Sequence, residues 1–220
     1  MTVFADFGST WSKVVDTSLR IMKTKEVPKD ILVDFACGHN AEKRSKKCVN
    51  ELIALSEGGL RLINETDFLL VDVGSRDIKY VLYANGRFVQ TGWNQECGAS
   101  QGFAIELLEM YYGLDCSDLE APEDGYPVTC GLIGISRIFD EIIKTGDEKK
   151  AVAKFIKGIA MNVYHFTGRP EKMYLSGGLC ENTLFMESLP CEVIPMGRLV
   201  LIEGLKEIYK KGASFIKAIK

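Results

Sequence analysis

The segment Asp-Phe-Gly-Ser-Thr-Trp-Ser-Lys at residues 6–13 returns in altered form as Asp-Val-Gly-Ser-Arg-Asp-Ile-Lys at residues 72–79. In both copies an apolar stretch leads into an aspartate, a Gly-Ser turn and a second segment that carries a lysine. Internal repetition of this kind indicates a duplicated architecture. We therefore expect an α/β fold of two related lobes. The predicted domains are an N-terminal lobe at residues 1–66 and a C-terminal lobe at residues 67–220.

The rest of the chain alternates between strand-like and helix-like patterns. Apolar periodicity predicts a helix over residues 43–55, which Gly58-Gly59 would end. Asn85-Gly86 predicts a two-residue hairpin turn. Further predicted strands cover residues 3–7, 13–16, 31–36, 68–73, 77–83, 87–91, 172–175 and 193–194, and further predicted helices cover residues 101–112, 136–143, 149–166 and 199–211.

Composition excludes several classes of protein. The 220 residues are 46% hydrophobic and 26% charged, which is typical of a globular protein. A net charge of -3 gives no basic footprint for nucleic acid or an anionic membrane. No signal peptide or membrane-length apolar run is found, so a cytoplasmic location is expected. The seven cysteines are widely spread and include no Cys-x-x-Cys pair, which argues against a disulfide framework and a self-contained zinc site.

The two Gly-Ser turns have the chemistry of phosphate binding. Such a turn exposes successive backbone N–H groups that bind anionic oxygens, and the hydroxyls of Ser9 and Thr10 add donors. Asp6 and Asp72 can hold Mg²⁺ directly or through water, and Lys13 can offset phosphate charge. Two facing turns would clamp a triphosphate between the lobes. The later turn Ser176-Gly177-Gly178 is expected to approach the adenosine.

Several motifs, in the same order, resemble those of the ATP-dependent activators of 2-hydroxyacyl-CoA dehydratases. Residues 6–13 resemble the first phosphate motif of those proteins, DxGSTxxK, and residues 72–79 resemble their second, D-[IV]-G-G-Q-D-x-K. Residues 97–102, Cys-Gly-Ala-Ser-Gln-Gly, resemble C-A-A-G-T-G, and residues 176–182 resemble T-G-G-V-A-x-N. Weaker matches are Ala36-Cys37-Gly38-His39 to A-T-G-Y and Asn50-Glu51-Leu52 to S-E-[LI]. The N-terminal lobe is shorter here, roughly between Asp16 and Ile31.

This resemblance implies a fold, a function and a set of site residues. The implied fold is the two-lobed ribonuclease H-like fold of actin, Hsp70 and sugar kinases. The implied function is an ATP-hydrolysing homodimer that uses Mg²⁺, shares a [4Fe–4S] cluster between subunits, and conditions or reduces a partner redox metalloenzyme. The expected catalytic residues are Asp6 and Asp72. The expected nucleotide-binding residues are Gly8, Ser9, Thr10, Lys13, Gly74, Ser75, Asp77, Lys79, Gly102, Gly177, Gly178, Asn182 and Gly204.

The sequence departs from the family at the implied cluster. Cys97 matches the first cysteine ligand, but Ser136 stands where the second is expected. A neutral hydroxyl is a poor iron ligand compared with a thiolate, and Cys130, six residues upstream, is the candidate substitute. Two alternatives therefore stay open. One is a cluster-free ATP-sensing subunit of an assembly that activates a redox enzyme, and the other is a small-molecule kinase on the same fold.

Overall fold

The fold contains two five-stranded sheets with the same strand order. The computed structural model describes residues 2–95, 102–128 and 131–218. Within these, the first sheet has the order β3-β2-β1-β4-β5 and the second has the order β8-β7-β6-β9-β10. In each sheet the first strand of the set lies centrally, with the second and third strands on one side and the fourth and fifth on the other. The internal repeat of the sequence is thus a repeat of topology.

The first sheet places the first motif between two partner strands. β1 runs antiparallel to β2 and parallel to β4, so Asp6 lies opposite Lys13 on one side and Cys37 on the other. The register therefore gathers three polar or reactive side chains at the carboxyl end of β1. The strands of this sheet are β1 (Phe4–Phe7), β2 (Trp11–Val15), β3 (Leu19–Lys23), β4 (Val33–Gly38) and β5 (Ser45–Cys48).

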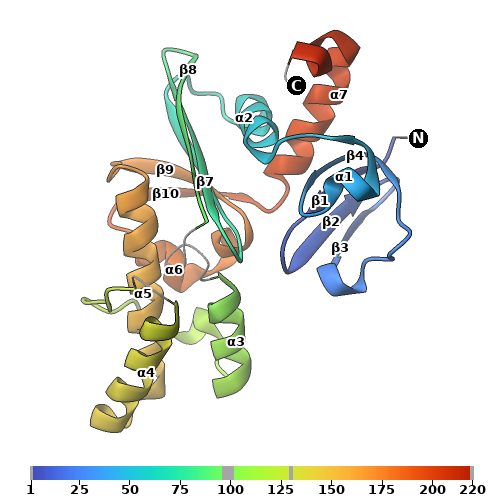
Figure 1. The fold of residues 1–220 in the computed structure, drawn as a ribbon. Coiled ribbons are helices and arrows are strands. Elements are labelled where there is room, and N and C mark those ends of the chain that lie inside the picture. Colours follow the sequence, from blue (N-terminus) through green and yellow to red (C-terminus); the bar gives the residue numbers. More distant parts are fainter. Residues whose placement is uncertain (1, 96–101, 129–130, 219–220) are drawn as a thin grey trace. The chain divides into compact units, whose positions relative to one another are not determined.

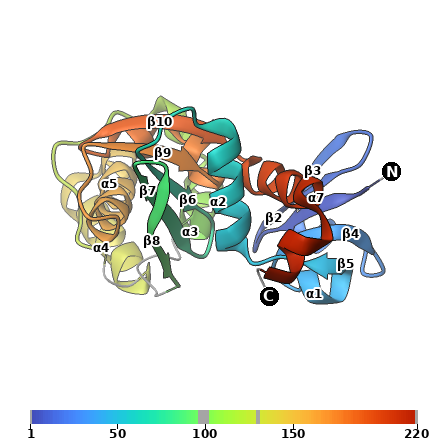
Figure 2. The same ribbon diagram turned by 90° about the horizontal axis from the view of Figure 1, so that it is seen from above.

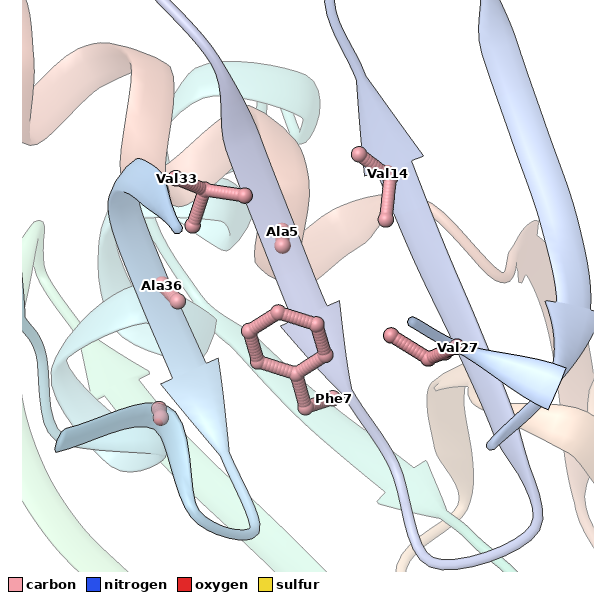
Figure 3. Packing of buried hydrophobic residues seen from close by; sticks show 7 residues of the cluster. Ala5, Phe7, Val14, Val27, Val33 and Ala36 are labelled. Atoms are coloured by element: carbon pink, nitrogen blue, oxygen red, sulfur yellow. The ribbon is translucent and has the colours of Figure 1, made fainter. Parts of the chain in front are cut away.

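One face of the first sheet is covered by a short connection. Between β3 and β4 the chain forms only the 3-10 turn η1 (Thr24–Glu26) and a loop. Val27 of this loop packs with Phe7 and Val14 in a small buried cluster (Figure 3). Because this connection has no helix, the packing of this face depends on a few loop side chains.

The other helices of the first compact unit are α1 (Ala41–Arg44), α2 (Glu51–Leu62) and α7 (Val200–Ala218). This unit contains residues 1–70, 81–91 and 198–220, so the last helix of the chain groups with the first strands. α2 and α7 lie side by side (Figure 2). Tyr209 of α7 packs edge-on against Phe4 and Phe35 of the sheet. α7 thereby covers the sheet through aromatic contacts.

The second compact unit contains residues 71–80 and 92–197. Its helices α3, α4 and α5 lie between β8 and β9 in the chain, where the first lobe has only η1, and α4 packs along α5 (Figure 1). The strands of the second sheet are β6 (Phe68–Val73), β7 (Ile78–Ala84), β8 (Arg87–Asn94), β9 (Lys172–Ser176) and β10 (Glu192–Gly197). The helical elements are α3 (Gly102–Tyr112), η2 (Cys116–Asp118), α4 (Gly131–Thr145), α5 (Glu148–Phe166), η3 (Gly178–Glu181) and α6 (Thr183–Glu187).

Two predictions about local structure were wrong. The predicted helix over 43–55 is interrupted, because residues 45–48 pair in parallel with β4 as strand β5. Gly58 and Gly59 lie inside α2 and do not end it. Their lack of a side chain allows close packing, since a Cβ on Gly58 would meet Val200 O at 2.2 Å. Strand β3 was also not predicted. Tertiary pairing and close packing decided all three features.

The hairpin prediction is confirmed. Asn85 and Gly86 have φ values of 52° and 69°, the left-handed pair that a type I′ turn requires. Among the described residues, no helix is both long enough and apolar enough to cross a membrane.

Candidate phosphate-binding turns and their surroundings

The first turn begins at a buried ion pair. Lys13 Nζ donates to Asp6 Oδ2 at 2.7 Å, and both side chains are buried. Cys37 Sγ lies 3.9 Å from Asp6 Oδ1 as a weak donor. The antiparallel and parallel neighbours of β1 thus fix one carboxylate from two sides. A buried carboxylate held in this way keeps a defined orientation.

Glycines at this turn allow close backbone approach. A Cβ on Gly8 would lie 2.5 Å from Trp11 O, so a side chain there would push the turn open. Gly38, at the end of β4, has a φ of 92° and lies directly on the Phe7 carbonyl, and His39 N donates to Phe7 O at 2.7 Å. Ser9, at the tip of the turn, is exposed. The tip is therefore accessible while its base is tightly packed.

The second turn has the same construction in the other unit. Ser176 of β9 donates through Oγ to Asp72 Oδ1 at 2.7 Å, and both residues are buried. Gly177 has a φ of 90°, and a Cβ there would lie 2.4 Å from Val73 O. Ser176 thus contacts Asp72 as Cys37 contacts Asp6. Gly177 likewise lies on the Val73 carbonyl as Gly38 lies on the Phe7 carbonyl. The predicted adenosine turn lies beside the second phosphate turn.

The lysine of the second motif has a different partner from that of the first. Lys79 Nζ donates to Asp77 Oδ1 at 2.8 Å, and Trp93 Nε1 donates to Asp77 Oδ2 at 2.7 Å. The Lys79 ammonium also lies 5.3 Å from the Trp93 ring centroid. The Asp77 carbonyl accepts from Gly74 N at 3.0 Å and closes the turn. Asp77 and Lys79 therefore brace the turn.

The start of α3 packs against the second turn. A Cβ on Gly102 would lie 2.6 Å from Gly74 O, and Phe103 N donates to Ser75 O at 3.2 Å. Gly102 thus lets the helix approach the turn backbone.

Three other predicted nucleotide residues have different surroundings. Gly178 has no neighbour within 4 Å of an added Cβ, so space is open beside it. Asn182 caps α6 through a hydrogen bond from Phe185 N at 2.8 Å. Gly204 lies where α7 crosses α2, and a Cβ there would lie 1.8 Å from Ala54 O. Helix packing accounts for Gly204 without a ligand.

The candidate cluster ligands Cys97 and Cys130 lie outside the described residues. Ser136 is exposed on α4. Within residues 2–95, 102–128 and 131–218 no three His, Cys, Asp or Glu side chains are grouped to hold a metal ion. Burial raises the pKa of the Cys116 thiol far above its usual value, and neighbouring Glu109 adds to the effect. Cys116 is therefore a protonated, structural thiol.

Sequence reasoning missed two contributors to these turns. Trp93 belongs to none of the motifs, yet its indole is a hydrogen-bond donor to Asp77. Thr24 was not singled out, yet its hydroxyl donates to Gly8 O at 2.7 Å. Neither hydrogen bond could be predicted, because each residue lies 16 positions from its partner in the sequence.

Comparisons with known proteins rest on structure alone, since no protein-family model and no curated protein sequence matches the chain. The activator of 2-hydroxyisocaproyl-CoA dehydratase from Clostridium difficile, solved with bound ADPNP, is similar with a TM-score of 0.75 at 18% identity, over 100% of this chain and 98% of that one. Component A of (R)-2-hydroxyglutaryl-CoA dehydratase from Acidaminococcus fermentans gives a TM-score of 0.73 at 18% identity, over 100% and 99%.

A more distant likeness extends the comparison. The ethanolamine utilization protein EutJ from Carboxydothermus hydrogenoformans gives a TM-score of 0.53 at 16% identity, over 93% of this chain and 88% of that one. The two dehydratase proteins match over all of this chain and 98–99% of their own chains, so the likeness extends to both sheets. The chain has the two-lobed, ribonuclease H-like α/β fold of the actin, Hsp70 and sugar-kinase superfold, in the form that dehydratase activators also adopt.

Proposed function

We propose that this protein binds and hydrolyses ATP and that nucleotide binding serves to activate a partner metalloenzyme. The observation that supports nucleotide binding most strongly is the duplicated environment of Asp6 and Asp72. Each aspartate lies one residue before the end of a central strand that leads into a Gly-Ser turn, and each accepts from a side chain of a neighbouring strand. Two copies of one turn geometry, one in each compact unit, are hard to explain by packing alone.

The residues of each turn suit the phosphates of a nucleotide. The backbone donors of residues 8–10 and of Ser75 would bind anionic oxygens, and the hydroxyls of Ser9 and Thr10 would add to them. Gly74 N closes its own turn on Asp77 O. Gly177 and Gly178 would lie along the adenosine, because Gly178 has open space beside it. Asp77 and Lys79 would act indirectly, since they hold each other and the turn.

Mg²⁺ fits the carboxylates of this site by its chemistry, because it prefers one or two carboxylates together with phosphate oxygens. Asp72 is the proposed residue for metal and water positioning, and Ser176 orients its carboxylate. Lys13 pairs with Asp6 and neutralises its carboxylate, so the first turn does not present an unpaired negative charge to the phosphates. Bound Mg²⁺ would neutralise charge that develops on the phosphates during hydrolysis.

Titration calorimetry with Mg-ATP and with ADP tests nucleotide binding. We expect saturable binding of both, and the proposal fails if neither ATP nor ADP binds. Asp72→Ala should reduce hydrolysis much more than binding, because its proposed role is in water and metal positioning. Asp67→Ala is a matched control, since Asp67 lies exposed at the start of the same strand segment and binds Asn85 N.

The activator role and the homodimer are proposed from the similar solved structures and from an exposed apolar face. The two most similar structures reported above are named as components or activators of dehydratases. Phe103, Leu107, Met110 and Tyr111 form a stripe of exposed side chains along α3, and Met110 and Tyr111 are each 75% exposed. An exposed apolar stripe of this kind is typical of a surface that becomes buried when another protein binds. A second copy of the chain is the proposed occupant.

Light scattering over a concentration series, with and without nucleotide, tests the homodimer. Met110→Glu and Tyr111→Glu should shift the equilibrium toward monomer, while Lys144→Glu, on the end of α4, should not. A monomer at every concentration and nucleotide state would contradict the dimer.

Ser136 favours a second candidate, the cluster-free ATP-sensing subunit. An iron–sulfur cluster typically takes four thiolates, and a symmetric dimer with Cys97 alone supplies two. Cys130 or a partner protein would have to complete the site. Ser136 is exposed on α4, so Ser136→Cys tests directly whether a cluster fails to form because the second cysteine ligand is missing.

Anaerobic reconstitution followed by absorption and EPR spectroscopy separates the two candidates. Cluster formation is compared between wild type and the variants Cys97→Ala, Cys130→Ala and Ser136→Cys. A cluster in wild type that is lost in both alanine variants supports the electron donor. A cluster that forms only in Ser136→Cys, with ATP binding intact in wild type, supports the cluster-free subunit. A cluster that appears only with a partner would mean a shared site.

A further inference from the structure

Thr24 directly follows β3 as the first residue of η1, outside both sequence motifs, and forms hydrogen bonds to both sides of the first turn. Its hydroxyl donates to Gly8 O at 2.7 Å, and its backbone N–H donates to Thr10 O at 2.8 Å. Ser12 Oγ lies 2.9 Å from Thr24 Oγ1. The Thr24 hydrogen is used on Gly8, so Ser12 is the donor of that last bond. Thr24 is thereby hydrogen-bonded to the start of the turn, to its end and to β2, the strand that follows the turn.

The surrounding packing makes this support local. The chain after Thr24 continues into Val27, which packs with Phe7, the residue before Gly8 (Figure 3). The 3-10 turn that contains Thr24 is the whole regular structure between β3 and β4. The tip residue Ser9 is exposed while Thr24 is half-buried. The hydroxyl therefore supports the turn from behind and leaves the tip accessible.

We infer that Thr24 is a positioning residue for the first phosphate-binding turn, an inference that rests on the proposed nucleotide site. It acts through Gly8 and Thr10. When its hydroxyl accepts from Ser12 and donates to Gly8, it fixes the direction of the Gly8 carbonyl and, with it, the orientation of the peptide group that joins Gly8 to Ser9. A turn that is held in this geometry before phosphate arrives needs less ordering on binding.

The test compares four variants by calorimetry. Thr24→Val keeps the shape and loses the hydroxyl, so the turn must be ordered when nucleotide binds, and affinity for Mg-ATP and ADP should fall about tenfold. Thr24→Ser keeps the hydroxyl and should stay within about twofold of wild type, and Ser12→Ala, which removes only the donor to Thr24, should fall between them. Thr17→Val, on an exposed residue of the same hairpin, should equal wild type.

The affinity for adenosine separates positioning from general disruption. Adenosine has no phosphate, so Thr24→Val should change its affinity by less than about twofold, whereas unfolding of the whole protein would weaken both ligands. Equal ATP affinity in wild type, Thr24→Val and Ser12→Ala would overturn the inference and leave the nucleotide site intact. If wild type binds no nucleotide, the proposed function itself fails, and Thr24 has no turn to position. Should Thr24→Val not fold, Ser12→Ala decides.

Discussion

Ser176 Oγ donates a hydrogen bond to Asp72 Oδ1 at 2.7 Å across 104 residues of sequence. Cys37 occupies the matching position beside Asp6 in the first copy, with its Sγ 3.9 Å from Asp6 Oδ1. The hydroxyl is a much stronger donor than the thiol. The two copies of the motif therefore hold their aspartates differently: Lys13 and the Cys37 thiol hold Asp6, whereas the Ser176 hydroxyl donates to Asp72.

Ser176→Ala should reduce ATP hydrolysis. Loss of the hydroxyl leaves a buried carboxylate without one of its donors, at a cost of about 1.5–3 kcal/mol, so Asp72 loses its fixed orientation. Hydrolysis by wild type and variant can be compared by phosphate release at saturating Mg-ATP. Ser176→Cys, which copies the arrangement at Cys37, should be intermediate. Unchanged hydrolysis in Ser176→Ala would show that the orientation of Asp72 does not matter.

The neighbouring glycines Gly177 and Gly178 should separate stability from binding. Gly177→Ala should destabilise the fold by at least about 1 kcal/mol, because its φ of 90° is unfavourable for alanine and its Cβ would meet Val73 O. Gly178→Ala should leave the unfolding midpoint unchanged, since space is open around it. Its nucleotide affinity should nevertheless fall. Thermal unfolding and calorimetry on both variants check this, and normal ATP affinity in Gly178→Ala would remove this turn from the site.

Gly204→Ala should destabilise the first compact unit. Its Cβ would lie 1.8 Å from Ala54 O, and overpacking of this kind costs about 1–3 kcal/mol or more. Urea unfolding compares it with Lys210→Ala, an exposed position on the same helix whose effect should stay below about 0.5 kcal/mol. If Gly204→Ala instead kept its stability and lost ATP affinity, the nucleotide role predicted from the sequence would be correct.

Thiol reactivity should distinguish Cys48 from Cys116. Burial raises both pKa values, and Cys116 lies so deep that its thiol stays protonated at any ordinary pH. Thiolate is the reactive form, so Cys48, which is exposed, should be alkylated first and faster as the pH rises toward its pKa. Cys116 should react only after unfolding in urea. Peptide mass spectrometry after iodoacetamide treatment measures both, and similar rates in the native protein would contradict the buried position of Cys116.

The two phosphate-like motifs, the hairpin at Asn85-Gly86 and most strands could be predicted from the sequence. Local signals suffice for these features: an apolar strand that ends in Asp-x-Gly-Ser and an Asn-Gly pair are defined by neighbouring residues. The repeat of the motif also predicted two related lobes, because a duplicated segment implies a duplicated fold.

Other features depended on residues far apart in the chain. Residues 45–48 have a helical pattern, but pairing with β4 makes them a strand. Gly58 lies inside α2, where the absence of a side chain lets the backbone of α7 pack closely against it. Thr24 and Trp93 become parts of the turns only when the sheets form, since their partners lie 16 residues away in sequence. The sequence by itself determined the turns and their chemistry, whereas the tertiary structure decided which distant side chains hold each turn, because backbone register and burial set those contacts.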